Sequence, residues 1–464
     1  MLRLLFISGV RKRVLNTPRN YCRCIKPALT HVYESGPINS SLYPSGLILV
    51  HEERDCPNAC ISLTFDAGSR YELPNENGIT HFFEHLCFKG TKKRSKSNIE
   101  TEMNEIGGKF KCYTTREMIG FSAECLSDNI PRALELLTDC IFNNSLSNNE
   151  IEIQKCIIYQ EMLHLDTDTS SVLFDYIHSA AFQGTPLSQS VMGPSHNLYN
   201  INSRSIAMYI EKMFVPARMI FSCVGPIKHE QACNLANTYL NRNVANPNIT
   251  RRYRFTAGDI RYRDDSMHVA HIALTVEAPP FPHADYLPML LAAMAIGAWD
   301  RSQPGGPNHS CILAQAGGEG IFNSYESFYI AYRDAGLWGL QFVSPRMEVE
   351  CALALMQDEW MKLCTIITDS VLIKTKQQLK WKILKENETV ESACHSHAKW
   401  VFYTNFAPTI KEKFDSIDKL VADDVRRVCY EYIYGKCPVV TAIGATEALL
   451  PNSRLTGGMY WLRF

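Results

Sequence analysis

An internal duplication constrains the fold of this chain more than any other feature. Residues 59–68 match residues 270–279 in residue type almost throughout, at an offset of 211 residues, and both segments read as short β-strands. A second pair, residues 133–137 and 352–356, matches at an offset of 219 residues. Two matches at nearly the same offset indicate two copies of one structural unit, the second with a few inserted residues.

Each copy is expected to contain both strands and helices. Residues 47–51 alternate as a strand does, and residues 130–142 have the apolar spacing of a helix. The predicted fold class is α+β, with two homologous domains, residues 35–242 and 251–464, each a sheet covered by helices. The polar stretch 241–252 is the expected join between them.

The first 33 residues differ sharply from the rest in charge. No aspartate or glutamate precedes Glu34, whereas seven residues are basic: Arg3, Arg11, Lys12, Arg13, Arg19, Arg23 and Lys26. An arginine-rich, acid-free start is typical of a mitochondrial presequence, which we expect at residues 1–26; a basic disordered tail is the alternative. Removing these seven charges from the formal net charge of −1 leaves a mature chain of about −8.

The composition excludes several classes of protein. A chain with no net basic charge lacks the field that non-specific nucleic-acid binding needs, so we expect no nucleic-acid partner. No apolar stretch is long enough for a transmembrane segment, and residues 287–299 predict a buried core helix instead. The 17 cysteines include no Cys-x-x-Cys pair and are expected to be reduced.

His81, Glu84 and His85 form the motif His-x-x-Glu-His, which carries the chemistry of the first half. On a helix these positions share one face, so both imidazoles and the carboxylate point into the same space. His81 and His85 are the predicted ligands of one zinc ion, and Glu84 is the predicted catalytic base, the acceptor of a proton from water. A chance match is the alternative, because short motifs carry that risk.

A third zinc ligand is expected on a separate element, because catalytic zinc takes three protein ligands and keeps one open position. The helix predicted over residues 148–165 offers Glu161. Ser147 and Glu150 have the spacing of a capping box, and Ile157 and Ile158 predict an apolar stripe that Glu161 shares. A carboxylate on an apolar face needs a partner, which a metal ion would supply.

The second half lacks the predicted ligands. The positions equivalent to His81, Glu84, His85 and Glu161 hold Ala292, Ala295, Ile296 and Lys380. If packing alone required the histidines and glutamates, the second copy should also tolerate them. We therefore expect the first half to be catalytic and the second half to be structural or to enclose the substrate.

The run HFFEHLCFKGT (81–91), with Glu161 76 residues after His85, resembles the pitrilysin-type metallopeptidases. Within that family, the chain is similar to the beta-type mitochondrial processing peptidases and to the core subunits of respiratory complex III. Other similar segments are FDAGSRY (65–71), YTTRE (113–117), GAWDRS (297–302), DAGLWG (334–339) and WLRF (461–464).

This resemblance implies mostly antiparallel sheets, one zinc ion and a homologous alpha subunit that carries a glycine-rich loop. The short segment QPGGP (303–307) fits the beta role. The implied reaction is the removal of basic presequences in the mitochondrial matrix or at the matrix face of the inner membrane, and an acidic mature chain would attract such substrates. The alternative is a structural core subunit of complex III, bound to its other subunits, with weak or no peptidase activity.

Two positions depart from the pattern of the family. A glutamate there precedes the third ligand by seven residues, where this chain has Gln154. The substrate-facing strand there has Asn-Ala before the tyrosine, where this chain has Lys111 and Cys112. The resemblance implies that each change could lower the rate without abolishing metal binding.

Overall fold

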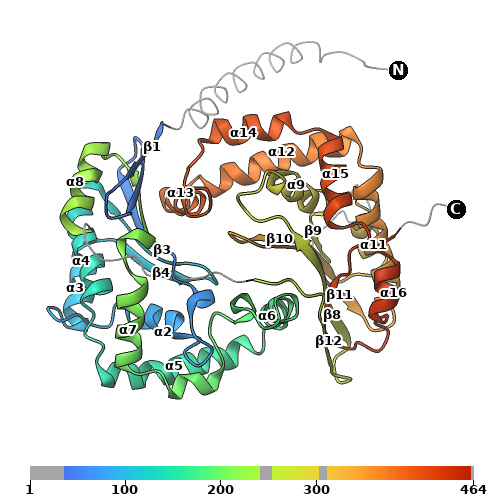
Figure 1. The fold of residues 1–464 in the computed structure, drawn as a ribbon, viewed down its shortest axis with the longest axis horizontal. Helices are drawn as coiled ribbons and strands as arrows, with labels where there is room; N and C mark the ends of the chain where they lie inside the picture. The colour runs from blue at the N-terminus through green and yellow to red at the C-terminus, as the bar shows by residue number, and fades with distance from the viewer. Residues whose placement is uncertain (1–35, 241–252, 303–310, 461–464) are drawn as a thin grey trace, which may run out of the picture.

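The computed structural model describes residues 36–240, 253–302 and 311–460 (Figure 1). The expected presequence (1–26), the expected join (241–252) and the segments 303–307 and 461–464 lie outside the described residues.

The N-terminal half contains a six-stranded sheet in the order β1-β2-β6-β3-β5-β4. Its strands are β1 (Ile38–Leu42), β2 (Ile48–Glu53), β3 (Asn58–Phe65), β4 (Lys109–Thr114), β5 (Ile119–Leu126) and β6 (Met219–Gly225). Strand β2 runs parallel to β6, and the other neighbours are antiparallel.

The C-terminal half contains a second six-stranded sheet, in the order β7-β12-β8-β11-β10-β9. Its strands are β7 (Asp259–Arg263), β8 (Val269–Ala278), β9 (Ala298–Asp300), β10 (Ser324–Ala331), β11 (Gly336–Pro345) and β12 (Val439–Gly444). Strand β12 runs parallel to β7, and the other neighbours are antiparallel.

Five strands of each sheet follow the same order and directions, β2-β6-β3-β5-β4 and β7-β12-β8-β11-β10, whereas the sixth strands, β1 and β9, lie at opposite edges. The duplicated segments 59–68 and 270–279 fall on β3 and β8, which pair with equivalent neighbours in their sheets. The predicted α+β class, with two homologous and mostly antiparallel sheets covered by helices, is confirmed.

Helices fill the space around both sheets. The N-terminal half contributes α2 (Ile79–Leu86), α3 (Lys96–Ile106), α4 (Ile130–Phe142), α5 (Asn148–Leu165), α6 (Thr169–Ala181), α7 (Ser203–Met213) and α8 (His229–Tyr239). The C-terminal half contributes α9 (Tyr286–Ile296), α10 (Ile312–Gly318), α11 (Val349–Thr365), α12 (Asp369–Glu386), α13 (Val390–Thr404), α14 (Ile410–Lys419), α15 (Ala422–Tyr432) and α16 (Asn452–Gly457).

Each half also sends one helix to the sheet of the other half. Helix α13 packs on β3 and β6, and α6 packs on β8 and β12, so both helices occupy the middle of the molecule (Figure 1). Buried Cys394 and Ala398 of α13 join cores with residues of the N-terminal sheet, such as Cys60 and Val50. The halves are thus interlocked through their hydrophobic cores.

A buried ion network also joins the halves. Arg70 Nη1 lies 2.7 Å from Glu117 Oε1 and 2.6 Å from Asp334 Oδ1. These residues come from three of the segments that resemble the metallopeptidase family, 65–71, 113–117 and 334–339. Because a buried guanidinium needs carboxylate partners, the network makes these three distant segments depend on one another.

Two details of the helix expected at 148–165 differ from the prediction. Helix α5 has the expected bounds, but the Ser147 side chain makes no capping hydrogen bond, and the buried Oε2 of Glu150 has no hydrogen-bond partner among the described residues. Ile158 is buried, whereas Ile157 is 45% exposed. The buried line of α5 follows Ile151, Gln154, Ile158 and Met162, and Glu161 lies beside it.

The apolar segment 287–299 forms the core helix α9, which ends three residues earlier than expected, at Ile296. Gly297 there has φ of +70°, and Trp299 belongs to β9. Across the described ranges, the helices are all too short or too polar to span a membrane. The cysteines of those ranges are free.

Candidate metal centre

Helix α2 carries the His-x-x-Glu-His motif on one face, and its opposite face anchors the helix in the N-terminal core. Phe82, Phe83 and Leu86 are buried in the N-terminal core, so the helix cannot rotate without exposing them. His81 and His85 consequently point toward Glu161 of α5, and Glu84 lies beside His81.

Glu72 fixes the beginning of α2. Its buried carboxylate accepts hydrogen bonds from the backbone N–H groups of Gly78, at 2.7 Å, and Thr80, at 2.8 Å, and from the Asn77 side chain. These are donors that a helix N-terminus otherwise leaves unpaired, and the carboxylate also complements the helix dipole. Burial raises the pKa of Glu72, although the hydrogen bonds oppose this shift.

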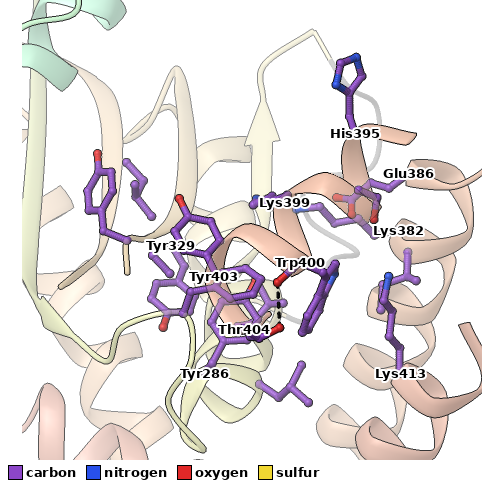
Figure 2. Close-up of a pocket in the computed structure, with 18 of the residues that line it drawn as sticks. Tyr286, Tyr329, Lys382, Glu386, His395, Lys399, Trp400, Tyr403, Thr404 and Lys413 are labelled. Atoms are coloured by element: carbon purple, nitrogen blue, oxygen red, sulfur yellow. Dashed lines mark hydrogen bonds between the residues drawn. The ribbon is translucent and has the colours of Figure 1, made fainter. Parts of the chain in front are cut away.

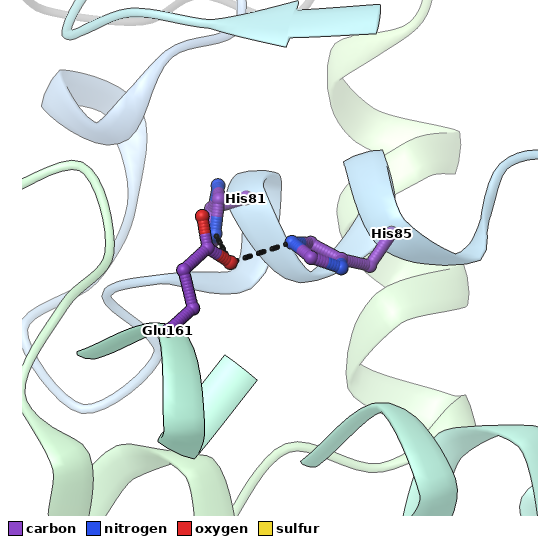
Figure 3. A group of neighbouring side chains, drawn as sticks. All are labelled: His81, His85 and Glu161. Atoms are coloured by element: carbon purple, nitrogen blue, oxygen red, sulfur yellow. Dashed lines mark hydrogen bonds and ion pairs between the residues drawn. The ribbon is translucent and has the colours of Figure 1, made fainter. Parts of the chain in front are cut away.

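Helix α5 brings Glu161 to the two histidines (Figure 3). Glu161 Oε2 lies 3.0 Å from His85 Nε2 and 3.4 Å from His81 Nε2. One ligand atom from each residue lies within 4.8 Å of the others. The structure therefore brings together the three residues that the sequence analysis predicted as metal ligands.

Glu84 stands beside this group. Its Oε2 lies 3.6 Å from His81 Nδ1, on the side of the ring opposite the atom that faces Glu161. The Glu84 side chain is partly exposed, so water can reach it. This is the placement that the sequence analysis predicted for a base next to the metal ligands.

The site is electrostatically suited to a cation. Burial lowers the pKa of His81, but the hydrogen bonds and charges of Glu84 and Glu161 outweigh burial and leave that pKa raised. Burial and the neighbouring His81 lower the pKa of His85. Two carboxylates thus favour positive charge at a point where the imidazole nitrogens converge.

The donor set fits zinc. Two imidazoles and one carboxylate on two packed helices are a known catalytic zinc set, which leaves a fourth position open. The single oxygen Oε2 of Glu161 already approaches both imidazoles, so small side-chain shifts suffice to gather the three donors around one ion.

The two residues that depart from the family pattern, Gln154 and Lys111, lie in different surroundings. Gln154 is 2% exposed on α5, and no described residue makes a hydrogen bond to its Oε1. Lys111 on the edge strand β4 lies 2.7 Å from Glu391, at the start of α13 in the other half. The lysine charge beside this strand is therefore partly balanced from the opposite domain.

Glu72 is the functional residue that the sequence analysis did not identify. Its role depends on a turn that returns the chain to the helix start, where Gly78 adopts φ of +101°. An acidic residue six positions before a glycine has no spacing rule of its own. The same segment also holds Glu76, so the sequence alone does not single out Glu72, which the structure shows to be buried.

The chain matches two family models. Residues 48–195 match Insulinase (Peptidase family M16), and residues 200–379 match the Peptidase M16 inactive domain. The first match contains His81, Glu84, His85 and Glu161, and the second covers α9 and most of α12, which lack them.

Two groups of relatives are similar to the chain along most of its length. The mitochondrial-processing peptidase subunit beta of Bos taurus is 34% identical over 99% of this chain and 94% of its own. Cytochrome b-c1 complex subunit 1, mitochondrial, of Rattus norvegicus is 34% identical over 91% and 90%. These relatives are mitochondrial proteins.

A solved structure shares the fold. A chain of Complex III2 from Candida albicans, Inz-5 bound, superposes with a TM-score of 0.81 at 21% identity, over 92% of this chain and 100% of that one. The family matches and the extent of the relatives lead to one conclusion: the chain belongs to peptidase family M16.

Proposed function

We propose that this chain is the zinc-binding, beta-type subunit of a mitochondrial peptidase that removes presequences. The observation that carries the proposal is the convergence of His81, His85 and Glu161 within 4.8 Å, with Glu84 beside them on the same helix. Structural packing alone does not explain two carboxylates and two imidazoles gathered on facing helices, because their partial burial is costly without a cation.

His81, His85 and Glu161 would hold the ion. Zinc would supply Lewis-acid polarisation of the scissile carbonyl and would acidify a water molecule. Glu84 would accept the proton of that water and return it to the leaving amine, since its carboxylate is partly exposed and bonded to no backbone group among the described residues.

The substrate class follows from charge and from the relatives. A mature chain of about −8 favours basic peptides. The name of the bovine relative describes a beta subunit of a mitochondrial processing peptidase. We therefore propose a homologous alpha subunit as the partner and the mitochondrial matrix, or the matrix face of the inner membrane, as the location.

The test is metal analysis and presequence cleavage with the alpha subunit of the same organism present. Glu84→Gln should keep zinc and lose cleavage, whereas His85→Ala should lose both. Glu152→Gln, an exposed change on α5, should keep both. Release of zinc by Glu84→Gln as complete as that by His85→Ala would contradict the assigned roles.

A structural core subunit of complex III is the second candidate. The observation in its favour is that the rat b-c1 subunit is as similar in identity as the peptidase subunit. Gln154 and Lys111 also suit a chain with attenuated activity. Migration of the chain with complex III in native gels, with no zinc bound in the presence of an alpha subunit, would favour this candidate over the peptidase.

A further inference from the structure

A large cavity lies between the two halves, apart from the candidate metal centre. Its volume is about 1280 Å³, and its lining includes residues of β4 and α6 on one side and of α9, β10, α12, α13 and α14 on the other. None of His81, Glu84, His85 and Glu161 lines it. Ordinary small-molecule pockets are of similar or smaller size, so the space can take a ligand.

Three lysines line this cavity and are referred to here as the lysine cluster: Lys382 of α12, Lys399 of α13 and Lys413 of α14 (Figure 2). Two glutamates, Glu386 and Glu412, also line the cavity, and the charge of Glu386 acts on both Lys399 and Lys413. Within the described part of the chain, no carboxylate oxygen lies within ion-pair distance of any of the three ammonium groups. Three ammonium groups against two carboxylates leave an excess of positive charge among these side chains.

Of the three lysines, Lys413 lies where a positive charge is costly, whereas Lys382 and Lys399 are exposed. Lys413 is only 6% exposed, and its Nζ lies 5.1 Å from the ring centre of Trp400. The Nζ of the exposed Lys399 lies 5.8 Å from the ring centre of Phe281. Burial lowers the pKa of Lys413 to about 8. Aromatic faces compensate a desolvated ammonium only in part.

The rest of the wall is aromatic and aliphatic. Phe281 stacks on Tyr403 at 4.6 Å, and Tyr286 packs against Phe281 at 4.4 Å. On α12, Leu379 and Ile383 face the cavity on the same side of the helix as Lys382. The cavity thus joins an apolar wall to a cationic group of side chains.

We propose that this cavity binds an anionic amphiphile, a long acyl chain that ends in a carboxylate or a phosphate. The head lies at the lysine cluster, and the acyl chain lies along the wall formed by α9 and α12. Such a ligand supplies the negative charge that the cluster lacks and removes apolar surface from water. A basic presequence does not suit this place, because the lysines repel it. The inference does not depend on the proposed peptidase activity.

The test uses the full chain and a fluorescent long-chain fatty acid, cis-parinaric acid. We expect saturable binding of about one probe per chain, with displacement by palmitate and by lysophosphatidate. Which of the two displaces at the lower concentration distinguishes a carboxylate from a phosphate head. Hexadecanol, which has the chain but no charge, should displace at least about 10-fold more weakly.

Variants separate this site from non-specific adsorption. The double change Lys399→Met and Lys413→Met should weaken binding about 10-fold or more, whereas Lys411→Met, an exposed lysine of the same helix α14, should not change it. Ile383→Trp should block the chain end of the site while leaving the lysines in place. Absence of saturable binding, equal displacement by hexadecanol, or equal binding by the double variant would each overturn the proposal.

Discussion

Gln154 is the residue where the metal centre departs most clearly from a complete polar network. It lies seven residues before Glu161, about 10.5 Å along α5, and its buried Oε1 has no described partner. Gln154→Glu would add negative charge on the side of the helix that approaches the histidines. We expect zinc affinity to rise about 10-fold, the usual size of effects from residues that support a metal site.

The measurement is a competition titration of zinc against a chelator. Gln160→Glu, the same chemical change on the exposed side of α5, is the matched control and should leave the affinity unchanged. If both variants bind zinc as the unchanged chain does, Gln154 is a neutral difference and does not attenuate the site.

Lys413 makes the stability of the folded chain depend on pH, in a direction that follows from its lowered pKa. Burial lowers its pKa from 10.5 to about 8, so between these values the folded chain has released a proton that the unfolded chain still holds. The contribution of this group to stability is therefore unfavourable at pH 7 and disappears as pH rises toward 10.5. The cost at pH 7 is about 3 kcal/mol.

Lys413→Met removes this cost, because methionine fills a similar volume without charge. The variant should be more stable than the unchanged chain by up to about 3 kcal/mol at pH 7, and the gain should shrink toward pH 10.5. Urea unfolding at pH 7 and pH 10 checks this, with Lys411→Met as the exposed control. A gain that is the same at both pH values would show that charge is not its cause.

At the scale of the element, the geometry of the metal centre depends on how α2 begins. The Glu72 carboxylate accepts two backbone N–H groups there, and an amide has only one oxygen to offer. We expect Glu72→Gln to cost about 1–2 kcal/mol and to weaken zinc binding, because His81 lies one residue beyond the bonded Thr80. Glu76→Gln, in the same segment, is the control.

Thermal unfolding and zinc titration together test this role of Glu72. Loss of stability with unchanged zinc affinity would mean that Glu72 supports the fold but does not position the metal ligands. Loss of both quantities is the expected result.

The sequence predicted helices well where the spacing of residues along one helix face indicates which face is buried. The bounds of α4 and α5 matched the apolar spacing, and the spacing of the motif placed His81, Glu84 and His85 on one side of α2. The predicted capping box was wrong although Ser147 and Glu150 have its spacing. The Ser147 side chain makes no capping hydrogen bond, and Glu150 Oε2 is buried without a described partner. The predicted apolar stripe was half right, because Ile158 lies on the buried line of α5 whereas Ile157, turned about 100° from it around the helix, is exposed.

Partners across the molecule were not predictable in the same way. The pattern of α13 shows that Ala393, Cys394 and Ala398 are buried, but not which sheet buries them. The lysine cluster likewise joins residues from three helices whose relative placement has no local signal. Spacing within one element fixes which face is buried, whereas the choice of partner is set by the whole fold.

At the scale of the whole molecule, the exchange of α6 and α13 makes the two halves a single folding unit. Without α13, the N-terminal sheet exposes Val50, Cys60, Ile220 and Val224, all of them buried in the whole chain. Without α6, the C-terminal sheet exposes Ala273, Val439 and Ile443. The Glu52–His397 contact, at 2.5 Å, and the Arg70 network would also lose partners.

Residues 36–240 and 253–460, produced separately, should therefore each fail to unfold cooperatively, although each contains a complete sheet. The uncovered faces would bind hydrophobic dyes, because apolar surface that an interlocked helix should cover is left in water. Coexpression should restore a complex in which the fragments associate and unfold in one transition near that of the intact chain, since the cores shared by α6 and α13 do not require a continuous chain. Calorimetry and dye binding measure both outcomes. A cooperative transition in either fragment alone would show that the exchanged helices add contact but do not complete the domains.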